Sequence, residues 1–231
     1  MTGGEAGDAE TPEATATAPA GSSLYATLGE IGYFGQVALA AVDLVLLAAT
    51  SLDYASSIPS TVVETLLVLL ISVVWLQLGR KVGNSWFLAA GVSGAASVVF
   101  GLALSLGSGV NPSSSYIIAT DLQSLISLVY FVMQVSAFFS AARAFQVRLF
   151  RYAGYLFVIT FVVTFIVGAV GMIATISSTN QMQSGADLAT LGVDGALSAV
   201  TSLVAGIGFR RLRGTPGVPG LNLPTAGRPS R

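Results

Sequence analysis

The chain has 231 residues, of which 53% are hydrophobic and 9% are charged, and its formal net charge is −1. A soluble domain carries about 25% charged residues, so this composition predicts a chain surrounded by lipid rather than water. The sequence has no cysteine and no histidine. This excludes disulfides, thiolate nucleophiles and the usual protein ligands of haem, zinc and copper, and we expect no cofactor.

The first segment, residues 1–22, is acidic, rich in Ala, Thr, Gly and Pro, and has no basic residue. A secretory signal peptide begins with a positively charged region, so we do not interpret this segment as one. Its composition predicts a disordered cytoplasmic tail.

Six apolar stretches follow, each close to the roughly 20 residues that a membrane-spanning helix needs. Gly, Pro, Ser and Asn punctuate the short breaks between them. The fold class that we predict is all-α: a polytopic membrane protein in which residues 23–213 form a bundle of six transmembrane helices. The first helix has an alternative start near Ser23, as an interfacial segment. The predicted spans are Ile31–Thr50, Thr61–Leu78, Ser85–Leu106, Ile117–Ala142, Tyr152–Ile176 and Asp187–Phe209.

The basic residues predict the orientation of the bundle. All ten lie between spans two and three, between spans four and five, or after span six. The positive-inside rule therefore places both termini in the cytoplasm, and residues 214–231, rich in Pro and Gly, form a second disordered tail. We expect Trp75, Trp86, Tyr152 and Tyr155 to form an interfacial aromatic belt. The predicted location is the cell membrane, as a multi-pass protein of a prokaryotic plasma membrane.

Three carboxylates stand near the predicted outer starts of the even-numbered spans, at Glu64, Asp121 and Asp187. Thr61 precedes Glu64 by three residues, as Ser184 precedes Asp187, and this spacing is typical of a capping box. A carboxylate in a first helical turn is also favoured by the helix dipole. The sequence therefore predicts a capping role for these residues.

Two further carboxylates, Asp43 and Asp194, lie inside spans one and six, and no predicted span contains a basic residue to neutralise them. At 1.5 Å per residue, each lies about 10 Å below the outer boundary. Polar residues share a helical face with Asp43 in span one and form another face in span four. The functional hypothesis is a cation or proton site built from Asp43, Asp194, Gln123, Ser127 and Gln36. The alternative is hydrogen bonding between helices.

Two membrane aspartates also raise the possibility of intramembrane proteolysis. Proteases of the presenilin type carry Tyr-Asp, Gly-x-Gly-Asp and Pro-Ala-Leu elements, whereas here Val42 precedes Asp43, Val193 precedes Asp194 and there is no Pro-Ala-Leu. We therefore predict no enzymatic activity.

The linker between spans four and five carries Arg143, Arg148 and Arg151 among apolar residues. These arginines are candidates for contacts with anionic lipid headgroups, or ordinary anchors on the cytoplasmic side. In span three, Ala90 with Gly94 and Gly91 with Ala95 are pairs of small residues that allow close helix packing.

Three functions remain open from the sequence. The first is a non-catalytic accessory or scaffold subunit of a membrane assembly or homo-oligomer, and the alternative is a small transporter or channel that uses the membrane aspartates. An enzyme acting on lipid or peptide has the least support. The expected partners are membrane lipid and other membrane subunits or further copies of the chain, with no nucleic acid.

Overall fold

The computed structural model describes residues 20–49, 58–107, 114–176 and 181–214, and these ranges form six α-helices. Each helix contains an apolar stretch of 20 to 23 residues, long enough to cross a membrane. The chain is therefore a multi-pass membrane protein, as predicted. The helices are α1 (Ala20–Ala49), α2 (Ile58–Val82), α3 (Ser85–Gly107), α4 (Ser114–Ala144), α5 (Arg148–Ile176) and α6 (Gln181–Gly214). Apart from residues 20–22 and 214, the two predicted tails lie outside the described residues.

The helices extend beyond the predicted spans at several ends. α1 runs without a break from Ala20, so the interfacial start is part of one continuous helix. α2 begins at Ile58 and includes Pro59, because proline is well tolerated in a first helical turn, where its missing N–H leaves no bond unmade. Thr61 and Ser184 therefore lie inside α2 and α6, and the predicted capping boxes are wrong.

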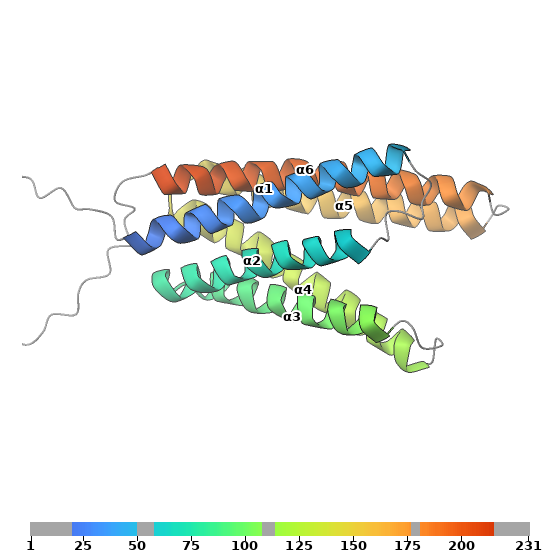
Figure 1. Cartoon of the computed structure of the whole chain (residues 1–231), viewed down its shortest axis with the longest axis horizontal. Helices are drawn as coiled ribbons and strands as arrows, with labels where there is room; N and C mark the ends of the chain where they lie inside the picture. Colours follow the sequence, from blue (N-terminus) through green and yellow to red (C-terminus); the bar gives the residue numbers. More distant parts are fainter. Residues whose placement is uncertain (1–19, 50–57, 108–113, 177–180, 215–231) are drawn as a thin grey trace, which may run out of the picture.

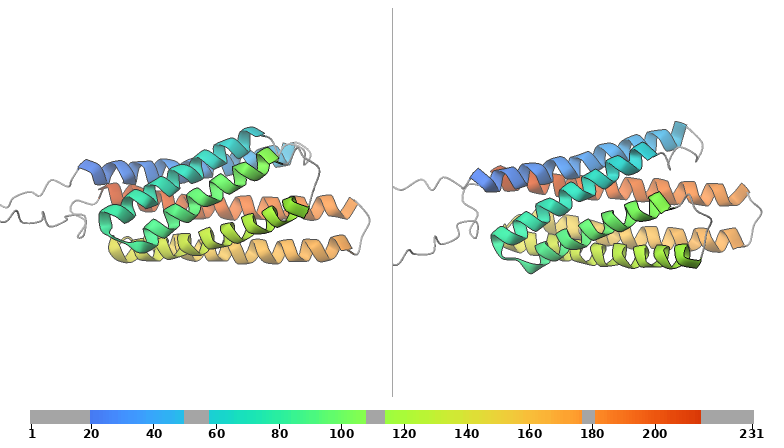
Figure 2. Two further views of the ribbon diagram at one scale, coloured as in Figure 1. Left: turned by 90° about the horizontal axis from the view of Figure 1, so that it is seen from below. Right: turned by 60° about the horizontal axis from the view of Figure 1, so that its bottom comes forward.

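The helices follow one another around the bundle in chain order, and α6 packs against α1 to close a ring. Figure 1 shows α1, α5 and α6 together on one side and α2, α3 and α4 on the other. Both views in Figure 2 place the start of α1, the end of α6 and the α2–α3 and α4–α5 turns at the same end of the bundle. We call this the basic end, because the described Arg and Lys residues occur there: Arg80, Lys81, Arg143, Arg148, Arg151, Arg210, Arg211 and Arg213.

The α2–α3 turn shows why the chain reverses where it does. Gly83 has a φ of 68°, a left-handed conformation that glycine adopts without steric cost. The following N–H, of Asn84, then donates to the carbonyl of Gly79 at 3.2 Å, which closes the end of α2 in the manner of a Schellman motif. The side-chain oxygen of Asn84 accepts a hydrogen bond from the backbone N–H of Trp86 at 2.9 Å and caps α3.

The buried core lies at the basic end and is mainly aromatic. Trp75 has no exposed surface, and its ring centroid is 5.7 Å from that of Phe138 and 5.5 Å from that of Phe209. Phe150 packs edge-on against Phe209 at 5.1 Å. The prediction that Trp75 belongs to an interfacial belt is therefore wrong, whereas Trp86 is 47% exposed. The core joins the ends of the helices on this side and closes the ring there.

Candidate functional site

A cavity of about 420 Å³ lies inside the ring, beyond the aromatic core as seen from the basic end. Residues from α1, α2, α4, α5 and α6 line it, because the closed ring brings helices from both ends of the chain to one interior space. Tyr33 belongs to both the core and the cavity wall, so the core forms the floor of the cavity.

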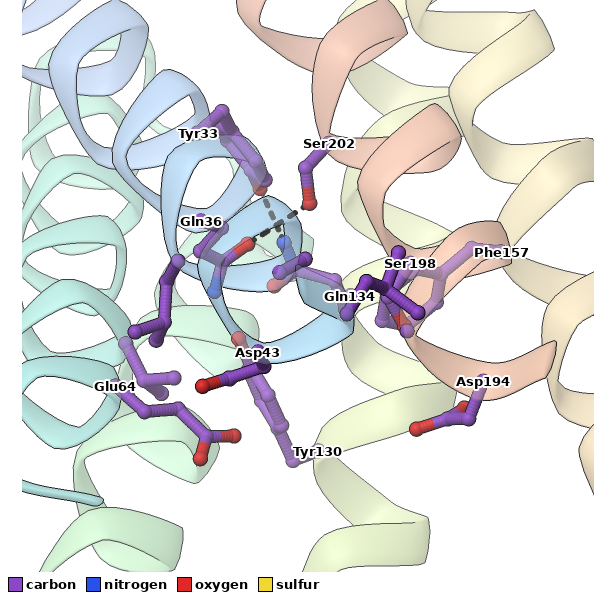
Figure 3. Close-up of a pocket in the computed structure, with 15 residues that line it drawn as sticks. Tyr33, Gln36, Asp43, Glu64, Tyr130, Gln134, Phe157, Asp194, Ser198 and Ser202 are labelled. Carbon is purple, nitrogen blue, oxygen red and sulfur yellow. Dashed lines mark hydrogen bonds between the residues drawn. The ribbon is translucent and has the colours of Figure 1, made fainter. Parts of the chain in front are cut away.

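Three carboxylates line this cavity: Asp43 from α1, Glu64 from α2 and Asp194 from α6. Figure 3 shows them at the end of the cavity away from Tyr33 and Ser202. None of the described residues that line the cavity is basic, so the carboxylates have no cationic side chain beside them there.

The aspartate in α6 has one hydrogen-bond donor from a neighbouring helix. The hydroxyl of Thr164 in α5 donates to Oδ1 of Asp194 at 2.9 Å. Asp43 and Asp194 are partly buried, whereas Glu64 is exposed. The site therefore combines two carboxylates set into the bundle with a third that is more accessible.

The floor of the cavity is a network of neutral polar groups. The hydroxyl of Ser202 donates to Oε1 of Gln36 at 3.0 Å. The Tyr33 oxygen accepts from Nε1 of Trp75 at 3.1 Å and from Nε2 of Gln134, so the Tyr33 proton remains available to a further acceptor.

One atom of this network lacks a partner. Gln134 is 1% exposed, and its Oε1 has no hydrogen-bond partner among the described residues. A buried acceptor left unpaired costs about 1–3 kcal/mol, so this amide is a costly element of the network.

The structure brings three of the predicted site residues together and leaves two apart. Asp43, Asp194 and Gln36 line the cavity, whereas Gln123 and Ser127 do not. Nε2 of Gln123 donates to the backbone oxygen of Ser97 in α3 at 3.3 Å and to Oγ of Ser127 at 3.4 Å. The bond to Ser97 is hydrogen bonding between helices, the alternative to a cation site for these two residues.

Sequence reasoning missed Glu64 as a cavity residue and assigned it to a helix cap. The signal that could have found it is Pro59, which is favoured in a first helical turn and would have placed Glu64 one turn further along the helix. Tyr33 and Phe157 also line the cavity without any sequence signal, because their placement depends on how α1 and α5 pack. The side chains of Asp121 and Asp187 lie outside the described residues.

Charged groups at the basic end pair across helices. Glu30 in α1 lies 3.0 Å from a guanidinium nitrogen of Arg213 and 3.9 Å from Nε of Arg210, both in α6. Lys81 lies 4.6 Å above the ring of Tyr25, which links α2 to α1. These contacts reinforce the closed end of the ring.

The three arginines of the α4–α5 region, Arg143, Arg148 and Arg151, are all exposed at the basic end. Between them, Gln146 has a φ of 58° and turns the chain from α4 into α5. Contact with lipid headgroups stays a prediction for these arginines.

Comparisons with protein-family models, with curated proteins and with solved structures found no match to this chain. The fold alone therefore assigns no function to the chain.

Proposed function

We propose that the protein is a small membrane transporter that binds a cation in the carboxylate-lined cavity and moves it across the membrane. One observation carries this proposal: Asp43, Glu64 and Asp194 come from three different helices and line the same cavity, and no described lining residue is basic. Carboxylates gathered without a counter-charge form a site of negative potential, which attracts and concentrates cations.

The energetic cost of these groups supports a functional role. An aspartate inside a membrane-spanning helix is costly, by up to about 2.5–3.5 kcal/mol at the helix centre on insertion scales and by less towards the ends, where these carboxylates lie. Ionisable residues inside membrane spans generally mark ion or substrate pathways for this reason. A bound cation offsets this cost.

The shape of the bundle also agrees with transport. The aromatic core closes the ring at the basic end, and the cavity lies on the other side of that core. A carrier alternates between states in which its site is reached from one side or the other. In our proposal, this arrangement is the state that is closed at the basic end. Rearrangement of the aromatic core would open the cavity to that end.

The accessory-subunit hypothesis has less support. The small-residue pairs in α3 pack against other helices of the same chain and so do not form a surface for a partner. Gly91 packs against Leu76 and Ser72, and Gly94 packs against Ser72 and Tyr130. A scaffold role also gives no reason for three carboxylates in one cavity.

Charge movement in liposomes tests the proposal. The full chain is reconstituted, adsorbed to a solid-supported membrane and exposed to concentration jumps of Na⁺, K⁺, Mg²⁺ and 1,4-diaminobutane in turn. We expect a current with at least one of these cations. In the Asp43→Asn/Asp194→Asn double variant, the half-saturating concentration should rise about tenfold or more, since charge-assisted bonds contribute about 1.5–3 kcal/mol.

The matched control is Ser93→Ala. Ser93 lies in α3, its hydroxyl bonds to the carbonyl of Ala89 in the same helix at 2.7 Å, and it does not line the cavity. This variant should respond like the wild type. Absence of current with every cation, or equal currents in the wild type and the double variant, would overturn the proposal.

A further inference from the structure

The arrangement of the carboxylates constrains which cation the cavity fits. Among the described residues, no group of three or more His, Cys, Asp or Glu side chains lies close enough to hold a metal ion. Ca²⁺ takes about 6–8 oxygen ligands at 2.3–2.6 Å, and Mg²⁺ requires near-octahedral ligands at about 2.0–2.1 Å. The three carboxylates therefore share a cavity without forming one coordination sphere.

The size of the cavity fits a molecule better than a bare ion. Its volume of about 420 Å³ falls within the range of about 300–1,000 Å³ that is typical of small-molecule sites. A water molecule occupies about 30 Å³ of liquid. The space therefore holds a small organic molecule and several waters.

The walls supply three kinds of contact for an organic cation. The carboxylates provide the charge, and Tyr33, Tyr130 and Phe157 provide aromatic groups of the kind that attract ammonium ions. The carboxylate oxygens also accept hydrogen bonds, which suits an N–H donor. A quaternary ammonium ion carries no such donor.

The anionic groups fall into two positions. Figure 3 shows Asp43 and Glu64 on one side of the cavity and Asp194 on the other. The cavity has three formal negative charges, and none of its described lining residues is basic. A ligand with two positive charges can therefore be neutralised there. Resting on the proposed function, we propose that the cation is a short aliphatic diamine, with one ammonium group at Asp43 and Glu64 and the other at Asp194.

The test measures binding to the full chain in detergent, with 1,4-diaminobutane as the probe. The Trp86→Phe background leaves Trp75 as the only tryptophan, and Trp75 bonds to Tyr33 in the cavity wall, so its fluorescence should report occupancy. Isothermal titration calorimetry provides a second readout that does not depend on fluorescence. The comparison ligands are butylamine, uncharged 1,4-butanediol, tetraethylammonium and Mg²⁺.

We expect the diamine to bind about tenfold more tightly than butylamine, as one additional charge-assisted hydrogen bond would give, and butanediol not to bind. In Asp194→Asn the diamine should lose this advantage, so that the ratio of the two affinities falls to about one. In Ser93→Ala the ratio should stay at the wild-type value.

Several results would overturn the diamine assignment. They are equal affinity for diamine and monoamine in the wild type, an unchanged ratio in Asp194→Asn, and tighter binding of tetraethylammonium or Mg²⁺ than of the diamine. Currents with a metal ion and no diamine binding would overturn the assignment and leave the proposed function standing. Diamine binding without current would support the assignment and overturn transport, and the absence of both would overturn both.

Discussion

Close packing of α2 against α3 makes Gly91 the most informative position for testing the fold. A Cβ added there would lie 2.4 Å from Cγ of Leu76, 2.7 Å from the backbone nitrogen of Leu76 and 2.7 Å from the backbone oxygen of Ser72. Two of these atoms are backbone, so the helices themselves must separate by about 0.7 Å to restore a 3.4 Å contact. Such overpacking lowers the free energy of unfolding by about 1–3 kcal/mol. Because the contact is with backbone, we expect this loss in Gly91→Ala to be about 3 kcal/mol.

The matched control is Gly168→Ala in α5, where an added Cβ would meet nothing within 4 Å. Alanine is favoured over glycine in a helix by about 1 kcal/mol, and both variants gain this amount. Gly91→Ala should therefore be about 2 kcal/mol less stable than the wild type and Gly168→Ala about 1 kcal/mol more stable. The difference of about 3 kcal/mol corresponds to about 6–12 °C in melting temperature for a protein of this size.

Thermal unfolding of the two variants in detergent, followed by tryptophan fluorescence, measures this difference. Both proteins carry the same substitution in long helices, so detergent effects act on them alike. Melting temperatures within about 2 °C of each other would refute the packing of α2 against α3 described above.

Three further predictions follow from contacts elsewhere in the chain. Tyr33→Phe should lower the free energy of unfolding by about 1–3 kcal/mol and shift the emission of the buried tryptophan, because two buried donors lose their acceptor. Chemical unfolding and fluorescence spectra measure the two effects, and wild-type values would contradict the network. Arg213→Gln should lower the free energy of unfolding by less than about 1 kcal/mol at low salt and not at all at high salt. Arg210→Gln should have a smaller effect, because the contact of Arg210 with Glu30 is longer. Equal losses of stability at both salt concentrations would contradict these ion pairs. The chain has no cysteine, so single Asn84→Cys and Gly109→Cys variants report its orientation in the membrane. An impermeant maleimide applied to intact cells should label only Gly109→Cys, and labelling of Asn84→Cys would reverse the predicted orientation.

The sequence was sufficient to predict the class of fold and the number of spans. Apolar stretches of the right length and ten basic residues confined to alternate connections leave few other arrangements. The ends of the helices were harder to predict from the sequence, because residues such as Pro59 and Ser184 are compatible with both a helix and a break. The cap assigned to Glu64 failed for this reason.

The site was predicted only in part, since it depends on the order of helices around the ring. Asp43 and Asp194 were recognisable as costly charges inside apolar spans. Nothing in either span indicated that α1 and α6, at opposite ends of the chain, pack against each other. The polar face of α4 also divides, with Gln134 in the cavity and Gln123 bonded to α3, a distinction that requires the position of α3.

Carbodiimide modification of the cavity carboxylates tests the central claim most directly. Dicyclohexylcarbodiimide adds to a protonated carboxyl group within the membrane and rearranges to a stable N-acylurea, which peptide mass spectrometry locates. We expect labelling at Asp43, Glu64 and Asp194, and about tenfold less at all three when 1,4-diaminobutane, or the cation that gives currents, is present at ten times its Kd. Glu30, paired with arginines at the basic end, should show no such protection. Labelling of the cavity carboxylates that no cation changes would contradict a shared cation site.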